Sequence, residues 1–97
     1  MISDEDFLRL FNAAALAAKT PNNPPDEATS LDATFADLGI DSLDAMILGM
    51  YLCDVYQIPE EVGKHFRPKT VGEFKQMLEA ATTLTEINVE EAIESIK

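Results

Sequence analysis

The chain of 97 residues is long enough for one domain with a modest hydrophobic core. Hydrophobic residues make up 46% of it, which excludes a disordered tail. Eighteen acidic residues against seven basic ones give a formal net charge of −11, which argues against nucleic acid as a partner and favours partners with basic patches.

The first predicted element is an amphipathic helix that begins after Ser3. Ser3 and Asp6 form a variant of the capping box, in which the serine side chain accepts a backbone N–H three residues further on. Apolar residues then recur at helical spacing, at Phe7, Leu10, Phe11, Ala14 and Ala18. This stripe predicts a helix of about four turns that ends before Pro21.

A long loop is predicted between this helix and the next, over residues 19–41. Its first part, KTPNNPPDEATS, holds three prolines and two asparagines, which oppose regular structure. Because a loop of this length needs anchors or a function, its apolar residues are expected to pin it onto the core. These residues are Leu31, Phe35, Leu38 and Ile40.

The second long helix is predicted over residues 43–56, with Asp41 or Ser42 as its N-cap. Its residues are apolar on almost every side, so it is either buried on several sides or offers one side to a partner. Cys53 is the single cysteine, which excludes an intramolecular disulfide and a zinc cluster. It is expected to pack in a half-buried position rather than to react.

Two shorter helices are predicted next. The stretch PEEVGKHF begins with a proline and two glutamates, which are typical of a first helical turn, and it stops before Pro68. Thr70 and Glu73 form another capping box. The stripe that follows it is expected to be buried: Val71, Phe74, Leu78 and Ala81.

The last predicted helix lies in NVEEAIESIK, with Asn88 as its cap and Glu91 three residues further on. One of its faces carries Val89, Ala92, Ile93 and Ile96. The expected fold is therefore all-α: an antiparallel bundle of three longer helices plus one short helix, with a long loop between the first and second helices and an additional C-terminal helix.

The stretch LGIDSLDAM places a single serine, Ser42, between two acidic residues at the start of the second helix. Hydrolytic serine catalysis needs a nearby base, and the only histidine, His65, has no orienting motif. The glycine pattern of a nucleophile elbow is absent, and the acids at 32, 37, 41 and 44 do not follow the rhythm of an EF-hand. No catalytic residue and no metal site is therefore predicted, and an N-cap is the plainest role for Ser42 from its position alone.

The stretch LGIDSLD, followed by an apolar helix in a small acidic all-α chain, resembles the acyl carrier proteins. Their motif is Asp-Ser-Leu, preceded by Leu-Gly and a variable residue, and Asp41, Ser42 and Leu43 match it. The resemblance extends over residues 3–81 and includes the long first loop, the IPEE after the second helix and the TVGEF that opens the last family helix.

The resemblance implies that residues 1–81 are a carrier domain and that residues 82–97 are an extension with a short helix, packed on the bundle. It also implies that a separate phosphopantetheinyl transferase uses coenzyme A and Mg²⁺ to attach phosphopantetheine to the Ser42 hydroxyl. The arm ends in a thiol that carries acyl groups as thioesters. The chain would then not be an enzyme, and Ser42 would need no local base.

The resemblance further implies a surface beside Ser42 to which the enzymes dock. Its candidate residues are Asp41, Leu43, Asp44, Ile47, Met50 and Asp54. Carriers of fatty-acid synthesis usually have several glutamates along this helix, but Ile47, Cys53 and Val55 stand at such positions here. We therefore expect a more apolar docking surface and a specialised set of partners.

Family position also implies that the bundle core holds the acyl chain. The candidate pocket residues are Phe35, Leu52, Tyr56, Ile58, Phe66 and Phe74, which are core residues in either case.

These observations predict a stand-alone, monomeric acyl carrier that moves acyl thioesters between enzymes of a fatty-acid or specialised lipid pathway. Those enzymes are expected to have basic or apolar docking patches. No stretch is apolar for long enough to span a membrane, and the acidic start MISDEDFLRLF is not a secretory signal, so we expect a cytoplasmic protein. The alternatives are a polyketide- or peptide-type carrier, and a degenerate carrier that serves as a structural adaptor, against which the intact DSL argues.

Overall fold

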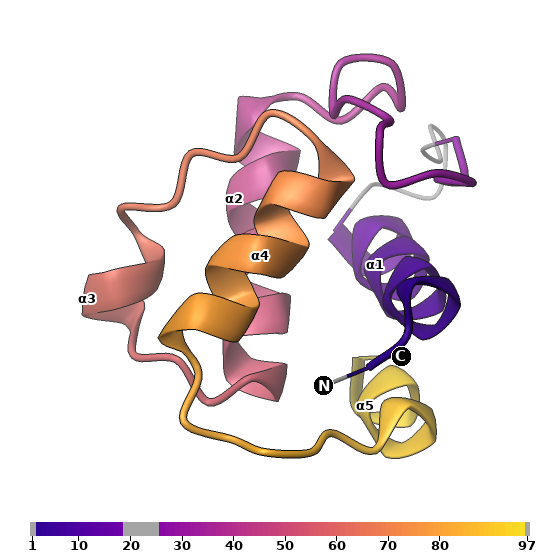
Figure 1. Ribbon diagram of the computed structural model, residues 1–97. Coiled ribbons are helices and arrows are strands. Elements are labelled where there is room, and N and C mark those ends of the chain that lie inside the picture. Colours follow the sequence, from indigo (N-terminus) through magenta and orange to yellow (C-terminus); the bar gives the residue numbers. More distant parts are fainter. Residues whose placement is uncertain (1, 19–25, 97) are drawn as a thin grey trace.

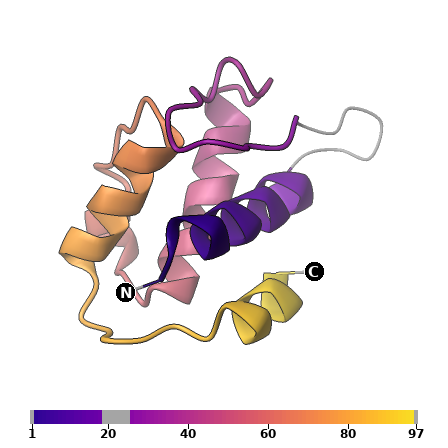
Figure 2. The same cartoon turned by 45° about the vertical axis from the view of Figure 1, so that its right-hand side comes forward.

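The computed structural model describes residues 2–18 and 26–96, which form five helices and no strand (Figure 1). This confirms the predicted all-α bundle. Helices α2 and α4 run in the same direction and α1 crosses them, as Figures 1 and 2 show together. The helices are α1 (Asp4–Ala18), α2 (Ser42–Val55), α3 (Glu60–Gly63), α4 (Val71–Ala81) and α5 (Val89–Ile96).

The predicted caps begin three of these helices. The backbone N–H of Asp6 donates to Ser3 Oγ over 3.1 Å at the start of α1. Thr70 Oγ1 accepts from the N–H of Glu73 over 3.1 Å at α4, and Asn88 Oδ1 accepts from the N–H of Glu91 over 3.1 Å at α5. Each side chain satisfies a donor that the first helical turn leaves without a partner, so these local signals decide where the helices start.

Helix α3 is shorter than the predicted stretch of residues 59–66, because it ends at Gly63. Beyond it, the N–H of His65 donates to Val62 O and the N–H of Phe66 donates to Gly63 O. These three-residue turns replace the helical pattern shortly before Pro68, which disfavours helical geometry in the residue that precedes it.

The described part of the long loop is tied to the helices by hydrogen bonds. The Asn12 amide pairs with the backbone of Ala28 in both directions, over 3.0 and 2.8 Å. The N–H of Gly72 donates to Leu31 O over 2.8 Å, and a Cβ at position 72 would lie 3.1 Å from that oxygen. Of the four predicted anchors, Leu38 and Ile40 are buried and the other two are half-buried. The prolines of this loop lie outside the described residues.

The core contains a row of aromatic rings that links α1 to α4. The centroid distances are 6.3 Å for Phe7–Phe11, 5.6 Å for Phe11–Phe35, 6.1 Å for Phe35–Phe74 and 6.4 Å for Phe74–Phe66. All are within the range in which tilted aromatic pairs attract each other. This row fixes the loop residue Phe35 between the helices, next to the site described below.

Helix α5 lies against α1 at the edge of the bundle (Figure 2). Val89 and Ala92 are buried there, and Arg9 Nη2 of α1 lies 2.6 Å from Glu90 Oε1. The division into a carrier domain of residues 1–81 and an extension of residues 82–97 stays a prediction. In the described ranges, every helix is too short or too polar to cross a bilayer.

Candidate functional site at the start of helix α2

The turn before α2 places Asp41, and not Ser42, at the N-cap. Gly39 has a φ of +73°, a backbone conformation that glycine adopts without strain. Asp41 Oδ1 then accepts the N–H of Asp44 over 2.8 Å, which makes Ser42 the first residue of the helix. Of the two N-cap candidates that the sequence left open, the structure therefore selects Asp41.

The Ser42 side chain is consequently not engaged in capping. Ser42 is exposed, and the described part of the chain contains no hydrogen bond to its hydroxyl. His65 is exposed in the turn after α3 and is not among the residues that line the pocket beside Ser42. The Ser42 hydroxyl is open to an external reactant, and the one histidine of the chain does not lie in the pocket beside it.

One face of α2 next to Ser42 is apolar and exposed. Leu43, Met46 and Met50 lie on successive turns and are 61%, 62% and 56% exposed. Sequence reasoning named Leu43 and Met50 but missed Met46, although its spacing of three and four residues from the other two was the signal. We call these three residues the apolar stripe of α2.

The other predicted docking residues differ in how far they reach the surface. Asp41 and Asp54 are exposed, whereas Asp44 and Ile47 are half-buried. Cys53, expected to be half-buried, is buried with only 7% of it exposed, so it adds little to the docking surface. Burial, and then the nearby charge of Asp54, raises the pKa of the Cys53 thiol, which keeps it protonated.

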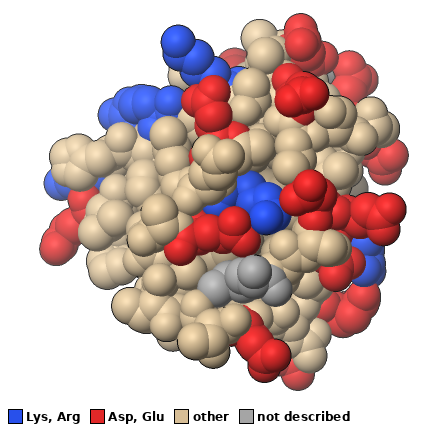
Figure 3. Space-filling model, in the orientation of Figure 1, with Lys and Arg blue, Asp and Glu red and all other residues tan. Residues whose placement is uncertain are grey.

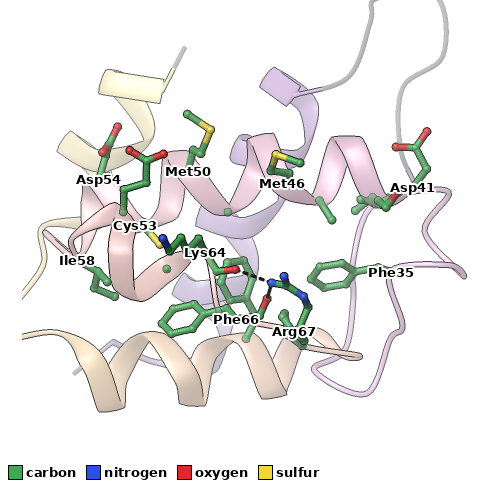
Figure 4. A pocket seen from close by; sticks show the side chains of 18 residues that line it. Phe35, Asp41, Met46, Met50, Cys53, Asp54, Ile58, Lys64, Phe66 and Arg67 are labelled. Carbon is green, nitrogen blue, oxygen red and sulfur yellow. Dashed lines mark hydrogen bonds between the residues drawn. The ribbon is translucent and has the colours of Figure 1, made fainter.

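A pocket of about 740 Å³ runs along α2 from Ser42 (Figure 4). One wall comes from α2 and includes Ala45, Met46, Gly49, Met50 and Cys53. The rest of the lining comes from the long loop before α2, from the loops around α3 and from α4. Four predicted acyl-pocket residues line the pocket: Phe35, Ile58, Phe66 and Phe74.

Leu52 and Tyr56, the other two predicted pocket residues, do not line this pocket. Both are fully buried and continue the stripe of Leu48 at intervals of four residues. This stripe is a different face of α2 from the one that carries Gly49 and Cys53, so these two side chains fill the core instead.

Two glycines, Gly49 and Gly63, line the pocket. A Cβ at position 63 would lie 2.6 Å from Cys53 Sγ, so an alanine there would force the sulfur or the end of α3 to shift. A Cβ at Gly49 would lie 3.8 Å from the Phe74 ring, which is an ordinary contact.

Two cations, Lys64 and Arg67, also line the pocket, and sequence reasoning did not identify them. Arg67 Nη1 donates to Lys64 O over 2.6 Å and to Phe66 O over 2.7 Å. No group of three His, Cys, Asp or Glu side chains in residues 2–18 and 26–96 is arranged to hold a metal ion.

A family model described as "Phosphopantetheine attachment site" matches residues 9–78. The matched span includes Ser42 and every residue that lines the pocket, and it ends before α5. Searches of the curated proteins and of the solved structures gave no match.

Proposed function

Because the chain belongs to the phosphopantetheine attachment-site family, we propose that Ser42 is the residue to which this group is joined. The observation that carries the proposal is the Ser42 side chain, which is exposed, hydrogen-bonded to nothing in the described residues, and placed at the start of α2. When attached, the group supplies a thiol that holds acyl groups as thioesters.

The first turn of α2 suits a phosphodiester on Ser42. The N–H groups of a first turn lack helical partners, and the helix dipole favours an anion there. The negative charges of Asp41 and Asp44 would repel the phosphodiester, although one carboxylate oxygen of Asp41 already accepts the N–H of Asp44. The same two carboxylates offer a modifying enzyme acceptors for its Lys or Arg side chains.

The chain is a phosphopantetheine carrier, and we propose that its cargo is an acyl intermediate of a fatty-acid or specialised lipid pathway. The support is the pocket beside Ser42, whose walls include Phe35, Ile58, Phe66 and Phe74. Its volume of about 740 Å³ falls within the usual range for small-molecule pockets. A hydrocarbon chain on the arm can gain free energy by leaving water for these walls.

We further propose that partners dock on the apolar stripe of α2 and the carboxylates at its ends. The stripe is Leu43, Met46 and Met50, and Asp41 and Asp54 are exposed at the two ends of the helix. The expected partners are a phosphopantetheinyl transferase and acyl-handling enzymes with apolar or basic patches. With few acids on α2, apolar complementarity contributes more than salt-sensitive attraction.

Carrier domains of this family are not catalytic themselves, and we propose the same for this chain. A polyketide- or peptide-type carrier is the alternative, and the apolar stripe favours it over a housekeeping role in fatty-acid synthesis because the usual row of glutamates is missing. The exposed Ser42 hydroxyl argues against a structural adaptor that needs no modification. A monomeric state and a cytoplasmic location stay predictions.

Intact-protein mass spectrometry tests the attachment residue. The protein is incubated with coenzyme A, Mg²⁺ and a broad-specificity phosphopantetheinyl transferase that is shown to modify another carrier. We expect a mass gain of one phosphopantetheine, which disappears in Ser42→Ala and persists in Ser30→Ala, an exposed serine of the loop. A gain that survives Ser42→Ala, or no gain in the parent protein, would contradict the proposal.

A further inference from the structure

The basic residues of this acidic chain are unevenly placed. The segment between α3 and α4 carries Lys64, His65, Arg67 and Lys69 and no acid. Figure 3 shows blue side chains gathered over this segment, at the upper left, while red side chains are spread over much of the rest of this face. The proposed carrier function does not by itself account for such a cluster in a chain of net charge −11.

Two of these cations, Lys64 and Arg67, are exposed and also line the pocket. Lys64 and Arg67 line it on the side opposite α2, and Figure 4 shows them between Asp54 at one end and Asp41 at the other. Lys69 does not line it. The cationic groups therefore face the middle of the space that the acyl chain would enter.

Arg67 is held in place by backbone carbonyls rather than by an acid. Its Nη1 donates to Lys64 O over 2.6 Å and to Phe66 O over 2.7 Å. Its other donors make no hydrogen bond within the described residues. The guanidinium is thus oriented while donors remain for a planar anionic acceptor, the geometry in which Arg binds a carboxylate.

The other cations with described ion pairs behave differently. Arg9 pairs with Asp6 and Glu90, and Lys75 pairs with Glu79 and Asp4. In residues 2–18 and 26–96, no carboxylate lies within ion-pair distance of Lys64 or Arg67. Asp54 and Glu60 also line the pocket, but neither contacts Lys64 or Arg67. An added anion could therefore bind these cations without displacing a carboxylate.

We propose that the pocket takes an acyl group that itself carries a carboxylate, such as a dicarboxylic half-thioester. The apolar walls formed by Phe35, Phe66 and Phe74 hold its methylene groups, and Arg67, assisted by Lys64, binds its carboxylate. This inference rests on the proposed function, because the acyl group reaches the pocket from the arm on Ser42.

The test compares two acyl groups with the same number of carbon atoms on the full chain. The transferase loads the arm from the coenzyme A thioester of glutarate or of pentanoate, and intact mass confirms each loading. The thermal midpoint of each form is then measured at low and high salt. The variants are Arg67→Gln and, as a matched control in the same segment, Lys69→Gln.

We expect the glutaryl form to melt about 2–5 °C above the pentanoyl form, with a difference that shrinks in high salt. Arg67→Gln should abolish the difference and Lys69→Gln should retain it. The direction of the difference in thermal midpoint is informative. A carboxylate added without a cationic partner to a chain of charge −11 should lower the midpoint.

Three results would overturn the inference. The glutaryl form could melt at or below the pentanoyl form, or the difference could persist in Arg67→Gln. Arg67→Gln could also lower the midpoint of the form with an arm but no acyl group by as much as it lowers that of the glutaryl form, which would assign the guanidinium to the phosphodiester. Failure to load at all would instead count against the proposed function.

Discussion

Asp41 Oδ1 accepts the backbone N–H of Asp44 at 2.8 Å, so the N-cap of α2 is the residue immediately before Ser42. Capping and the proposed modification therefore fall on neighbouring residues. A serine that capped the helix would lose that hydrogen bond whenever its hydroxyl was modified. Here the helix start does not depend on the Ser42 hydroxyl, so the modified and unmodified forms can share one backbone.

This separation predicts unequal costs for substitutions at the two positions. Asp41→Ala should lower the free energy of unfolding by about 1 kcal/mol, and Asp41→Asn by less, because Asn caps nearly as well as Asp. Ser42→Ala should change it by less than about 0.5 kcal/mol, since Ser42 is exposed. Urea unfolding followed by circular dichroism measures all three, and a cost at Ser42 equal to that at Asp41 would mean that the serine caps the helix.

Gly63 and Cys53 predict a second contrast. A Cβ at position 63 would lie 2.6 Å from Cys53 Sγ, so Gly63→Ala should destabilise the fold by about 1–3 kcal/mol. Adding Cys53→Ala should recover part of this loss, because the clashing sulfur is removed. Gly49→Ala is the control: its Cβ meets Phe74 at an ordinary 3.8 Å, and an alanine inside α2 should stabilise the helix by about 0.5–1 kcal/mol. If the effects of Gly63→Ala and Cys53→Ala on stability are strictly additive, the contact between the new Cβ and the sulfur is not the cause of the destabilisation.

Tyr56 predicts a dependence on alkaline pH. Its hydroxyl is buried and has no hydrogen-bond partner in the described residues, and burial, then the charge of Glu79, raises the pKa of the phenol well above its ordinary 10.0. Above pH 10 the unfolded chain releases this proton while the folded chain keeps it, so stability falls as the pH rises. Tyr56→Phe should reduce this fall and, by removing an unsatisfied polar group, raise stability at neutral pH by about 1 kcal/mol.

The control for this prediction is Tyr51→Phe, at a half-buried position in α2. It should keep the alkaline fall of the parent protein. The measurement is the urea midpoint across a series of pH values. If stability falls equally in Tyr56→Phe and in the parent, the buried phenol is not the titrating group. Other groups would then be responsible, such as Cys53, whose raised pKa acts in the same direction.

The features that the sequence could predict are local in the chain. The caps at Ser3, Thr70 and Asn88 and the exposed position of Ser42 follow from residues within one helical turn. The pair between Asn12 and Ala28 joins residues sixteen positions apart, and an isolated asparagine in a helix gives no sign of its partner. Such contacts depend on how the loop crosses α1.

The packing of the α2 faces could not be predicted for a related reason. Helix α2 is apolar on nearly every side, so its sequence does not show which side faces the core. Leu52 and Tyr56, which were expected to be core residues in either case, are fully buried and do not line the pocket beside Ser42. Cys53, expected to be half-buried, is buried against Gly63. Arg67 was missed because its orientation depends on two backbone carbonyls in a turn beyond α3.

Helix α5 gives the last prediction, which tests whether residues 82–97 are packed on the bundle through apolar contact. Ala92 is only 8% exposed where α5 meets α1, so Ala92→Glu would bury an unpaired charge and should lower the free energy of unfolding by more than about 2 kcal/mol. Arg9→Gln removes only an ion pair between exposed side chains and should cost less than about 1 kcal/mol, and Glu94→Gln is a neutral exposed control. Thermal unfolding of the three variants provides the comparison. If Ala92→Glu costs no more than Arg9→Gln, α5 contributes little to the stability of the bundle and residues 82–97 act as a separate segment; a large and selective cost means that α1 needs this cover.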